Sequence, residues 1–187
     1  MKPEIFNQEV RIHSDRLLLR PVSMEDAEDL LSIYGAESIY RFRPGMPRKT
    51  ISLVQKLIGR MQKEILEKKA VYLSVCDKTD HDKVVGIVEV FHMDGRIEKA
   101  EIGYTINPEK AGQGIATEAI GLITDYLIWQ GECNRITAMV HVENRASQKA
   151  LLKNGFVQEG TERQGEFWQG IGFVDVCRFA KLKSDYC

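Results

Sequence analysis

Two spacings of apolar residues alternate along this chain and divide it into expected strands and helices. Short apolar runs between turn residues predict strands over 16–21, 71–76, 84–91, 100–106 and 135–142, and two final strands joined by a hairpin around 165–172. Apolar residues repeated at helical spacing predict helices behind Ser23, over 51–65, behind Gly114 and over 145–154. Ser23 and Asp26 have the spacing of a capping box, and Gly155 followed by Phe156 predicts a Schellman-type helix end.

The order of these elements predicts a fold class. A strand and two helices are followed by three strands that are typical of an antiparallel meander. A helix, a strand, a helix and the final hairpin complete the chain. The sequence contains no internal repeat, low-complexity segment or linker. It is therefore expected to form one mixed α/β domain over residues 1–187.

Composition narrows the class of protein. Of the 187 residues, 43% are apolar and 28% are charged, with a net charge of −1, which favours a soluble protein without a nucleic-acid or membrane partner. No apolar run approaches the roughly 20 residues of a membrane span, and residues 1–9 lack a signal-peptide pattern. The dispersed Cys76, Cys133, Cys177 and Cys187 are expected to be free thiols in a reducing cytoplasm. Neither they nor the histidines have the spacing of a metal site.

The candidate chemistry begins at a glycine turn. Gly112 and Gly114 lie between the 100–106 strand and the helix behind it. Backbone N–H groups from about Gly112 to Thr117, together with the Thr117 hydroxyl, could bind a pyrophosphate at the positive end of the helix dipole. The turn completes neither the P-loop nor the Rossmann motif. On the glycines alone, a turn that merely joins strand to helix is an equally good interpretation.

A second motif indicates which phosphate compound is bound. The segment Asn144-Arg145-Ala146-Ser147 opens the 145–154 helix, where Asn144 can serve as the N-cap, and Asn-Gly-Phe closes it. With the glycine turn, this segment resembles the GNAT superfamily of acyl-CoA-dependent N-acetyltransferases. Within the superfamily it is most similar to the branch that acetylates N-termini of ribosomal proteins. Other segments that resemble the family's motifs, in the same order, are 14–21, 100–104, 114–119 and 163–170, with Asp175.

The resemblance implies a fold and a cosubstrate. The GNAT fold is α/β (α+β), with a mixed, mostly antiparallel twisted sheet of about seven strands and about four helices. Its sheet is splayed between the fourth and fifth strands, here taken as 84–91 and 100–106. Acetyl-CoA inserts there, and no metal is required. Residues expected to bind it are Ile102, Tyr104, Ile106, Gly112, Gln113, Gly114, Ile115, Ala116, Thr117, Asn144 and Ser147.

One position departs from the family pattern. Ala111 stands where the family has Gln or Arg, so a side-chain contact to the cosubstrate is lost. The backbone of the glycine turn carries most of the phosphate binding in this motif. Binding is therefore expected to be retained.

The resemblance also implies direct attack of an amine on the thioester, which gives a tetrahedral intermediate and a CoA thiolate. The amine must be neutral, and an α-amino group, with a pKa of about 7.7–8.0, needs a weaker base than a lysine with a pKa of about 10.4. Glu89 and Glu101 are candidate bases, although each could be a solvated strand carboxylate. Ser147 is the preferred acid for the thiolate. Tyr104 is the alternative, unless it is only a core aromatic residue.

The acceptor is less specified. The segment 40–48 carries Arg41, Arg43 and Arg48 beside aromatic residues, and either it lines an acceptor cleft or it is a solvated loop. Phe167 and Trp168 could line the same cleft or form a dimer contact, since a monomer and a homodimer are both compatible with the sequence. A protein N-terminus is the leading acceptor. A small amine such as a polyamine, an aminoglycoside or an amino-acid-like molecule is the alternative, and a non-catalytic acyl-CoA sensor is a third.

Overall fold

Eight strands within residues 9–186, the part of the chain that the structure describes, form one sheet in the order β1-β2-β3-β4-β5-β6-β8-β7. The coordinates are a computed structural model. The strands are β1 (Ile12–His13), β2 (Leu17–Pro21), β3 (Val71–Asp77), β4 (Lys83–Asp94), β5 (Lys99–Ile106), β6 (Arg135–His141), β7 (Val157–Trp168) and β8 (Gly172–Leu182). All neighbours are antiparallel except β5 and β6, which are parallel. The predicted meander is β3-β4-β5.

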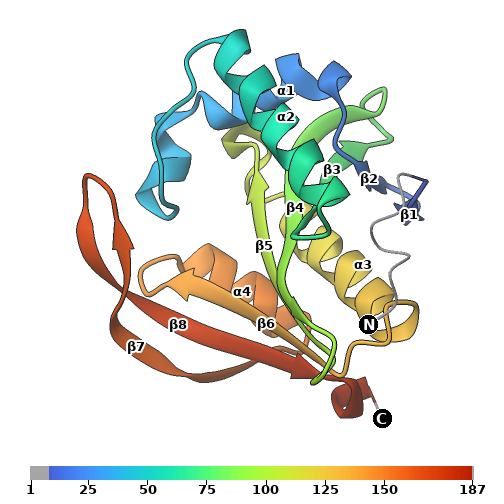
Figure 1. Ribbon diagram of the computed structural model, residues 1–187, viewed down its shortest axis with the longest axis vertical. Coiled ribbons are helices and arrows are strands. Elements are labelled where there is room, and N and C mark those ends of the chain that lie inside the picture. The colour runs from blue at the N-terminus through green and yellow to red at the C-terminus, as the bar shows by residue number, and fades with distance from the viewer. Residues whose placement is uncertain (1–8, 187) are drawn as a thin grey trace.

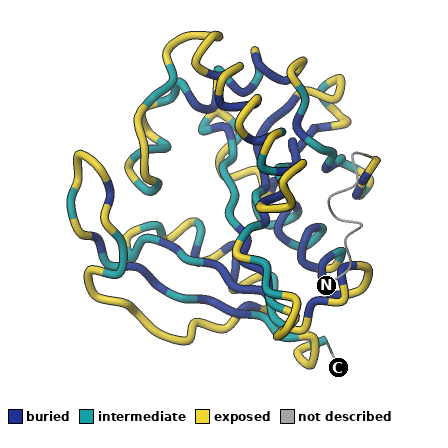
Figure 2. Tube along the Cα trace, in the orientation of Figure 1, coloured by how far each residue is buried: buried dark blue, intermediate teal, exposed yellow. Residues whose placement is uncertain are grey.

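Helices cover both faces of this sheet. The described residues form α1 (Ala27–Tyr34), α2 (Ile51–Leu66), α3 (Ile115–Trp129) and α4 (Arg145–Lys153), with short 3-10 turns η2 (Met24–Asp26), η3 (Glu37–Arg41), η4 (Pro108–Lys110) and η5 (Lys183–Tyr186). Helices α1 and α2 pack in one apolar cluster with Ile87 of β4, whereas α3 packs in another with Val88 and Ile102. Figure 2 shows buried residues along the central strands, while β7 is exposed over most of its length.

Local capping signals in the sequence are confirmed. Ser23 caps η2 with a full capping box, in which the Asp26 carboxylate accepts the Ser23 backbone N–H at 2.9 Å. At the end of α4, Gly155 has φ +77°, and the Phe156 N–H donates to the Leu151 carbonyl at 3.2 Å, as in a Schellman motif. The first strand, β1, was not predicted, because two residues give no hydrophobic alternation to detect.

The sheet is splayed, but one strand later than expected. Strands β4 and β5 pair from Gly86–Ile106 to Phe91–Glu101, so they form a continuous antiparallel ladder. Strands β5 and β6 pair only over Lys99–Glu101 with Arg135–Thr137 and then separate. The placement between 84–91 and 100–106 was therefore wrong. In Figure 1, β6, β8 and β7 turn away from β5 together. They turn as a unit because β6 pairs with β8 along the full length of β6.

Two further observations concern the chain as a whole. None of the helices in residues 9–186 is long and apolar enough to cross a membrane. Cys76, Cys133 and Cys177 are free and buried. The predictions made for the start of the chain and for Cys187 concern residues 1–8 and 187, which lie outside the described residues.

Candidate active site

The glycine turn forms the start of α3. Gly112 and Gly114 have φ +78° and +80°, and Gly114 is the N-cap of the helix. A Cβ added at either glycine would meet no atom within 4 Å, so both face open space. The first N–H groups of an α-helix have no intrahelical acceptor, and they point out along the positive end of its dipole. The turn therefore has the backbone geometry of a phosphate site.

Side chains from the segment just before β2 hold this turn in place. Arg16 donates from Nη1 to the Gln113 carbonyl at 2.9 Å and from Nη2 to Asp77 at 3.3 Å. The Ser14 hydroxyl donates to the carboxylate of Glu118 in the first turn of α3. These contacts give a structural reason for the Ser-x-Arg pattern at 14–16, because it fixes the position of the helix start.

A cavity of about 240 Å³ opens where β5 and β6 separate. Its floor is the part of β5 and β6 over which these two strands do not pair with each other. Its other walls come from β4, the segment after η3, the start of α4, the end of β7 and β8. The lining residues are Phe42, Arg43, Pro44, Glu89, Phe91, Ile102, Gly103, Tyr104, Thr105, Ala138, Met139, Val140, His141, Asn144, Ser147, Glu166, Trp168 and Val176. The cavity thus brings together five of the predicted site residues: Glu89, Ile102, Tyr104, Asn144 and Ser147.

On one side of the cavity, two hydroxyl groups form a pair. The Tyr104 Oη lies 2.6 Å from the Ser147 Oγ, and it also donates to the Ser147 carbonyl at 3.2 Å. Asn144 caps α4, since its Oδ1 accepts the Ser147 N–H at 3.2 Å. Burial raises the pKa of Tyr104 to about 12. The phenol therefore keeps its proton at neutral pH and can act as a donor.

On the side of α1 and α2, a carboxylate lies beside a guanidinium. Glu89 on β4 is opposite Gly103 of β5, which has no side chain to cover it. Burial raises the pKa of Glu89, and the charge of Arg43 opposes that rise. The Arg43 Nη2 lies 3.9 Å from the Glu89 Oε1. A carboxylate with a raised pKa in a cleft is a candidate proton acceptor.

Comparison with known proteins identifies the family. Residues 16–157 match the family described as the acetyltransferase (GNAT) domain. The chain belongs to the GNAT acetyltransferase family. It is accordingly an acetyl-CoA-dependent N-acetyltransferase. The open glycine turn at Gly112 and Gly114 fits the phosphate groups of that cosubstrate.

Relatives of this GNAT protein differ in their acceptors. The uncharacterised N-acetyltransferase p20 of Bacillus licheniformis is 31% identical over 94% of this chain and 97% of its own. The ribosomal protein uS5-alanine N-acetyltransferase of Escherichia coli is 27% identical over 81% of this chain and 80% of its own. Spermidine N(1)-acetyltransferase of the same organism is 24% identical over 90% and 87%.

A solved structure agrees in fold. The ribosomal-protein-S5-alanine acetyltransferase of Vibrio fischeri superposes with a TM-score of 0.80 at 21% identity, covering 96% of this chain and all of that one.

The structure does not bring Glu101 of this GNAT acetyltransferase to the cavity. Its side chain is 6% exposed. Glu101 is the last residue of β5 that pairs with β6, so it lies beside the point where these two strands separate. The Glu101 Oε1 is 3.7 Å from Arg178 Nη1 of β8, and its Oε2 is 3.3 Å from His92 Nδ1. Glu101 therefore joins β5 to β8 across β6.

Two titratable cavity residues of this GNAT acetyltransferase, His141 and Glu166, were not assigned a role from the sequence. His141 packs between the rings of Phe42 and Trp168, at centroid distances of 5.6 Å and 5.3 Å. Its Nδ1 accepts the Glu143 N–H at 3.1 Å, so the neutral ring carries its proton on Nε2. Glu166 reaches the cavity from β7. Of the two aromatic residues expected at the cleft, Trp168 lines the cavity, whereas Phe167 is 62% exposed and packs edge-to-face against Phe173. Neighbouring residues of a strand point to opposite faces, which separates Phe167 from Trp168 at the end of β7.

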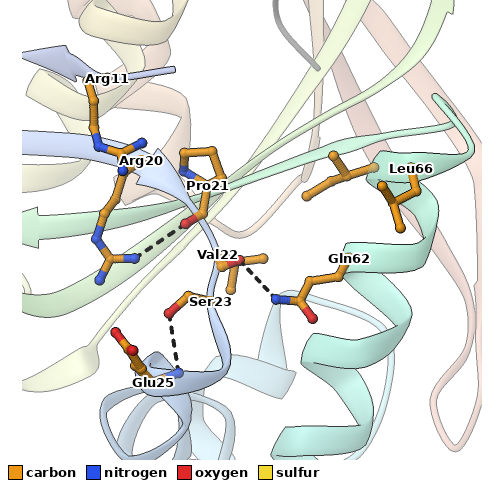
Figure 3. A pocket seen from close by; sticks show the side chains of 9 residues that line it. Arg11, Arg20, Pro21, Val22, Ser23, Glu25, Gln62 and Leu66 are labelled. Carbon is orange, nitrogen blue, oxygen red and sulfur yellow. Dashed lines mark hydrogen bonds between the residues drawn. The ribbon is translucent and has the colours of Figure 1, made fainter. Parts of the chain in front are cut away.

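This GNAT acetyltransferase has a second, larger depression, of about 490 Å³, between the end of β2 and α2 (Figure 3). None of the predicted site residues lines it. Its main cationic group is neutralised, because Arg20 forms two hydrogen bonds with Asp26, at 3.0 Å and 2.5 Å. Across it, Gln62 donates to the Val22 carbonyl at 3.5 Å. The Arg20 contacts tie β2 to η2, and the Gln62 contact ties the end of β2 to α2. We assign the chemistry to the other cavity.

Proposed function

We propose that this enzyme acetylates the N-terminal α-amino group of a protein or peptide. The observation that carries the proposal is the 240 Å³ cavity at the strand separation, with one partly buried carboxylate on one wall and a hydroxyl pair on another. An α-amino group, with a pKa of about 7.7–8.0, needs only a modest base. Glu89, whose pKa is raised by burial, is suited to that task.

The proposed roles follow from where each group lies. Glu89 accepts a proton from the acceptor ammonium or from the nitrogen as it is acylated, directly or through a water molecule. Bound acetyl-CoA supplies the acetyl thioester and, in its sulfur, the leaving group. The backbone N–H groups from Gly112 to Thr117 would hold its phosphates, and Asn144 would contact its pantetheine arm. The β5 backbone over 102–106 has no strand partner on the β6 side and would pair with the amides of that arm.

The hydroxyl pair is proposed to act on the departing sulfur. A thiol has an unperturbed pKa of about 8.5, whereas the pKa of Tyr104 is raised to about 12, so complete proton transfer would be uphill by roughly 5 kcal/mol. The pair therefore stabilises the thiolate by donating a hydrogen bond. The proton that finally neutralises the sulfur is the one released from the amine nitrogen, which reaches the thiolate through Glu89 and solvent.

We expect Tyr104→Phe and Ser147→Ala each to lower kcat by about 10- to 100-fold, because each removes one hydroxyl of a two-member donor unit. The double variant is expected to lose no more than the larger single loss, as groups that act as a unit are not additive. Steady-state thiol release measures this. Fully additive losses would show that the two hydroxyls act separately.

Glu101→Gln is expected to act on stability rather than on chemistry. The carboxylate is buried against Arg178, so its loss should lower the free energy of unfolding by roughly 1–3 kcal/mol and leave the pH profile of kcat unchanged. Thermal unfolding and a pH–rate profile test this together. A loss of activity of about 100-fold at unchanged stability would instead make Glu101 the base.

The acceptor is tested with an amine panel. The protein is incubated with acetyl-CoA and with N-terminal peptides, N-acetylated peptides that contain lysine, spermidine and an aminoglycoside, and free thiol is measured. Acetylation of the free N-terminal peptides alone supports the proposal. Turnover of spermidine alone would favour a small-amine enzyme. The sequence similarity to spermidine N(1)-acetyltransferase is the observation that favours this alternative. Binding of acetyl-CoA without turnover would indicate a sensor.

A further inference from the structure

Arg43 lines the cavity of about 240 Å³, and its contacts fix the position of its side chain. It follows η3, and its Nη1 donates to the Thr105 hydroxyl of β5 at 3.2 Å. Its guanidinium stacks over the ring of Tyr34 at 5.0 Å and lies 5.9 Å from that of Tyr40. The Tyr40 hydroxyl in turn donates to the Tyr34 carbonyl at 3.0 Å, which ties this segment to the end of α1. A planar, permanently charged donor is thereby held at the cavity wall.

Arg43 and Glu89 together present a donor beside an acceptor. The Arg43 Nη2 and Glu89 Oε1 are only 3.9 Å apart, and both residues line the cavity. The first residue of a peptide presents the complementary pair, because its amine nitrogen and its carbonyl oxygen are joined through a single Cα. With the amine at Glu89, the carbonyl oxygen of the same residue falls within the reach of Arg43. A guanidinium has five N–H donors, so Arg43 can bind this oxygen in addition to Thr105.

The same arrangement discriminates against diamines with closely spaced nitrogens. A 1,2-diamine has a second ammonium where the peptide has its carbonyl, and Arg43 would repel it. Specificity in proteins often combines one attractive contact with one repulsive contact of this kind. The charge of Glu89 is already balanced by Arg43, so the pair does not offer the surplus negative charge that a dication needs.

We infer that Arg43 is the specificity-determining residue for the acceptor, by binding the first carbonyl oxygen of an N-terminal residue and repelling a second ammonium. The inference rests on the proposed function and deepens it.

Three small amines that share one carbon skeleton test this inference. Alaninamide has the carbonyl, isopropylamine lacks it, and 1,2-diaminopropane replaces it with an aminomethyl group. The kcat/KM of each is measured by thiol release for wild type, Arg43→Met and Arg43→Lys. A change in the pKa of Glu89 affects all three amines and cancels in the ratio between two amines for one variant. Differences in the intrinsic basicity of the amines cancel when that ratio is compared between the variant and wild type.

We expect Arg43→Met to reduce the ratio of alaninamide to isopropylamine by about 10- to 100-fold, as for loss of a charge-assisted hydrogen bond. The ratio of 1,2-diaminopropane to isopropylamine should rise. Arg43→Lys should keep the diamine disfavoured, because the charge remains, and restore the carbonyl preference only in part. Unchanged acetyl-CoA binding and thermal midpoint establish that each variant is folded.

The possible failures are distinguishable. If wild type acetylates alaninamide and the ratios do not move in Arg43→Met, the inference is overturned while the proposed function stands. A wild-type enzyme that prefers the diamine, or that acetylates none of the three amines, overturns the inference. The proposed function is overturned only if the N-terminal peptides of the panel are not acetylated either.

Discussion

Replacing Glu89 with glutamine is expected to lower kcat/KM for an N-terminal peptide by about 100-fold at neutral pH. General bases contribute about 10²- to 10⁴-fold, and the lower end applies because part of an α-amino group is already neutral near pH 7. Since burial raises the pKa of Glu89, the wild-type rate should fall with decreasing pH as the carboxylate and the amine are both protonated. In Glu89→Gln only the ionisation of the amine should remain. A pH profile of kcat/KM measures both effects.

Stability provides the first control for this variant. A carboxyl group whose pKa is raised on folding binds its proton more tightly in the native state, so the folded protein is penalised as pH rises through that pKa. Glu89→Gln removes the penalty. The variant should therefore be no less stable than wild type at neutral pH.

Glu166→Gln provides the second control, because it removes the other carboxylate that lines the same cavity. If Glu166→Gln lowers kcat/KM and removes its fall at acidic pH, while Glu89→Gln changes neither, then Glu166 is the base.

Replacing Gly114 with valine is expected to weaken acetyl-CoA binding by about 100-fold or more. Gly114 has φ +80°, which a β-branched residue adopts only under strain, and its missing Cβ leaves open the space that the phosphates require. Loss of two charge-assisted hydrogen bonds accounts for about 3 kcal/mol, or roughly 100-fold. Ala111 offers no side-chain donor to compensate. Isothermal titration calorimetry with acetyl-CoA measures the change.

A matched control separates strain from binding. Gly170, in the turn between β7 and β8, has φ +85°, and a Cβ added there would likewise meet no atom within 4 Å. Gly170→Val should show a similar loss of stability and normal acetyl-CoA binding. Normal binding by Gly114→Val would place the phosphate site elsewhere.

What the sequence predicts well in this chain is local. The glycine turn before α3, the Ser23 capping box and the Gly155 helix end depend on residues a few positions apart, and all three were predicted. The splay was expected one strand too early. Its position depends on which strand pairs with β6. That pairing is set by the crossover through α3 and by β8, far away in the sequence.

The candidate site shows the same limit. Glu89 and Glu101 lie on adjacent strands and on the same face of the sheet, since Glu89 is opposite Gly103 and Glu101 is two residues away. Sequence alone could not rank them. Their surroundings differ because Arg178 approaches Glu101 from β8, whereas Arg43 approaches Glu89 from the segment after η3. The place of Glu166 in the cavity could not be predicted from the sequence either, because it depends on how the final hairpin of β7 and β8 folds over the cavity.

Strands β5 and β6 pair over only a few residues, which leaves unpaired backbone N–H and C=O groups along β5 in the interior of the sheet. An exposed edge normally invites another chain to add a strand, and proteins protect such edges. Here the edge faces the cavity, so the acetyl-CoA arm can complete the ladder in place of a strand. Ligand that binds only the folded protein stabilises it by mass action. CoA is consequently expected to raise the thermal midpoint of the enzyme.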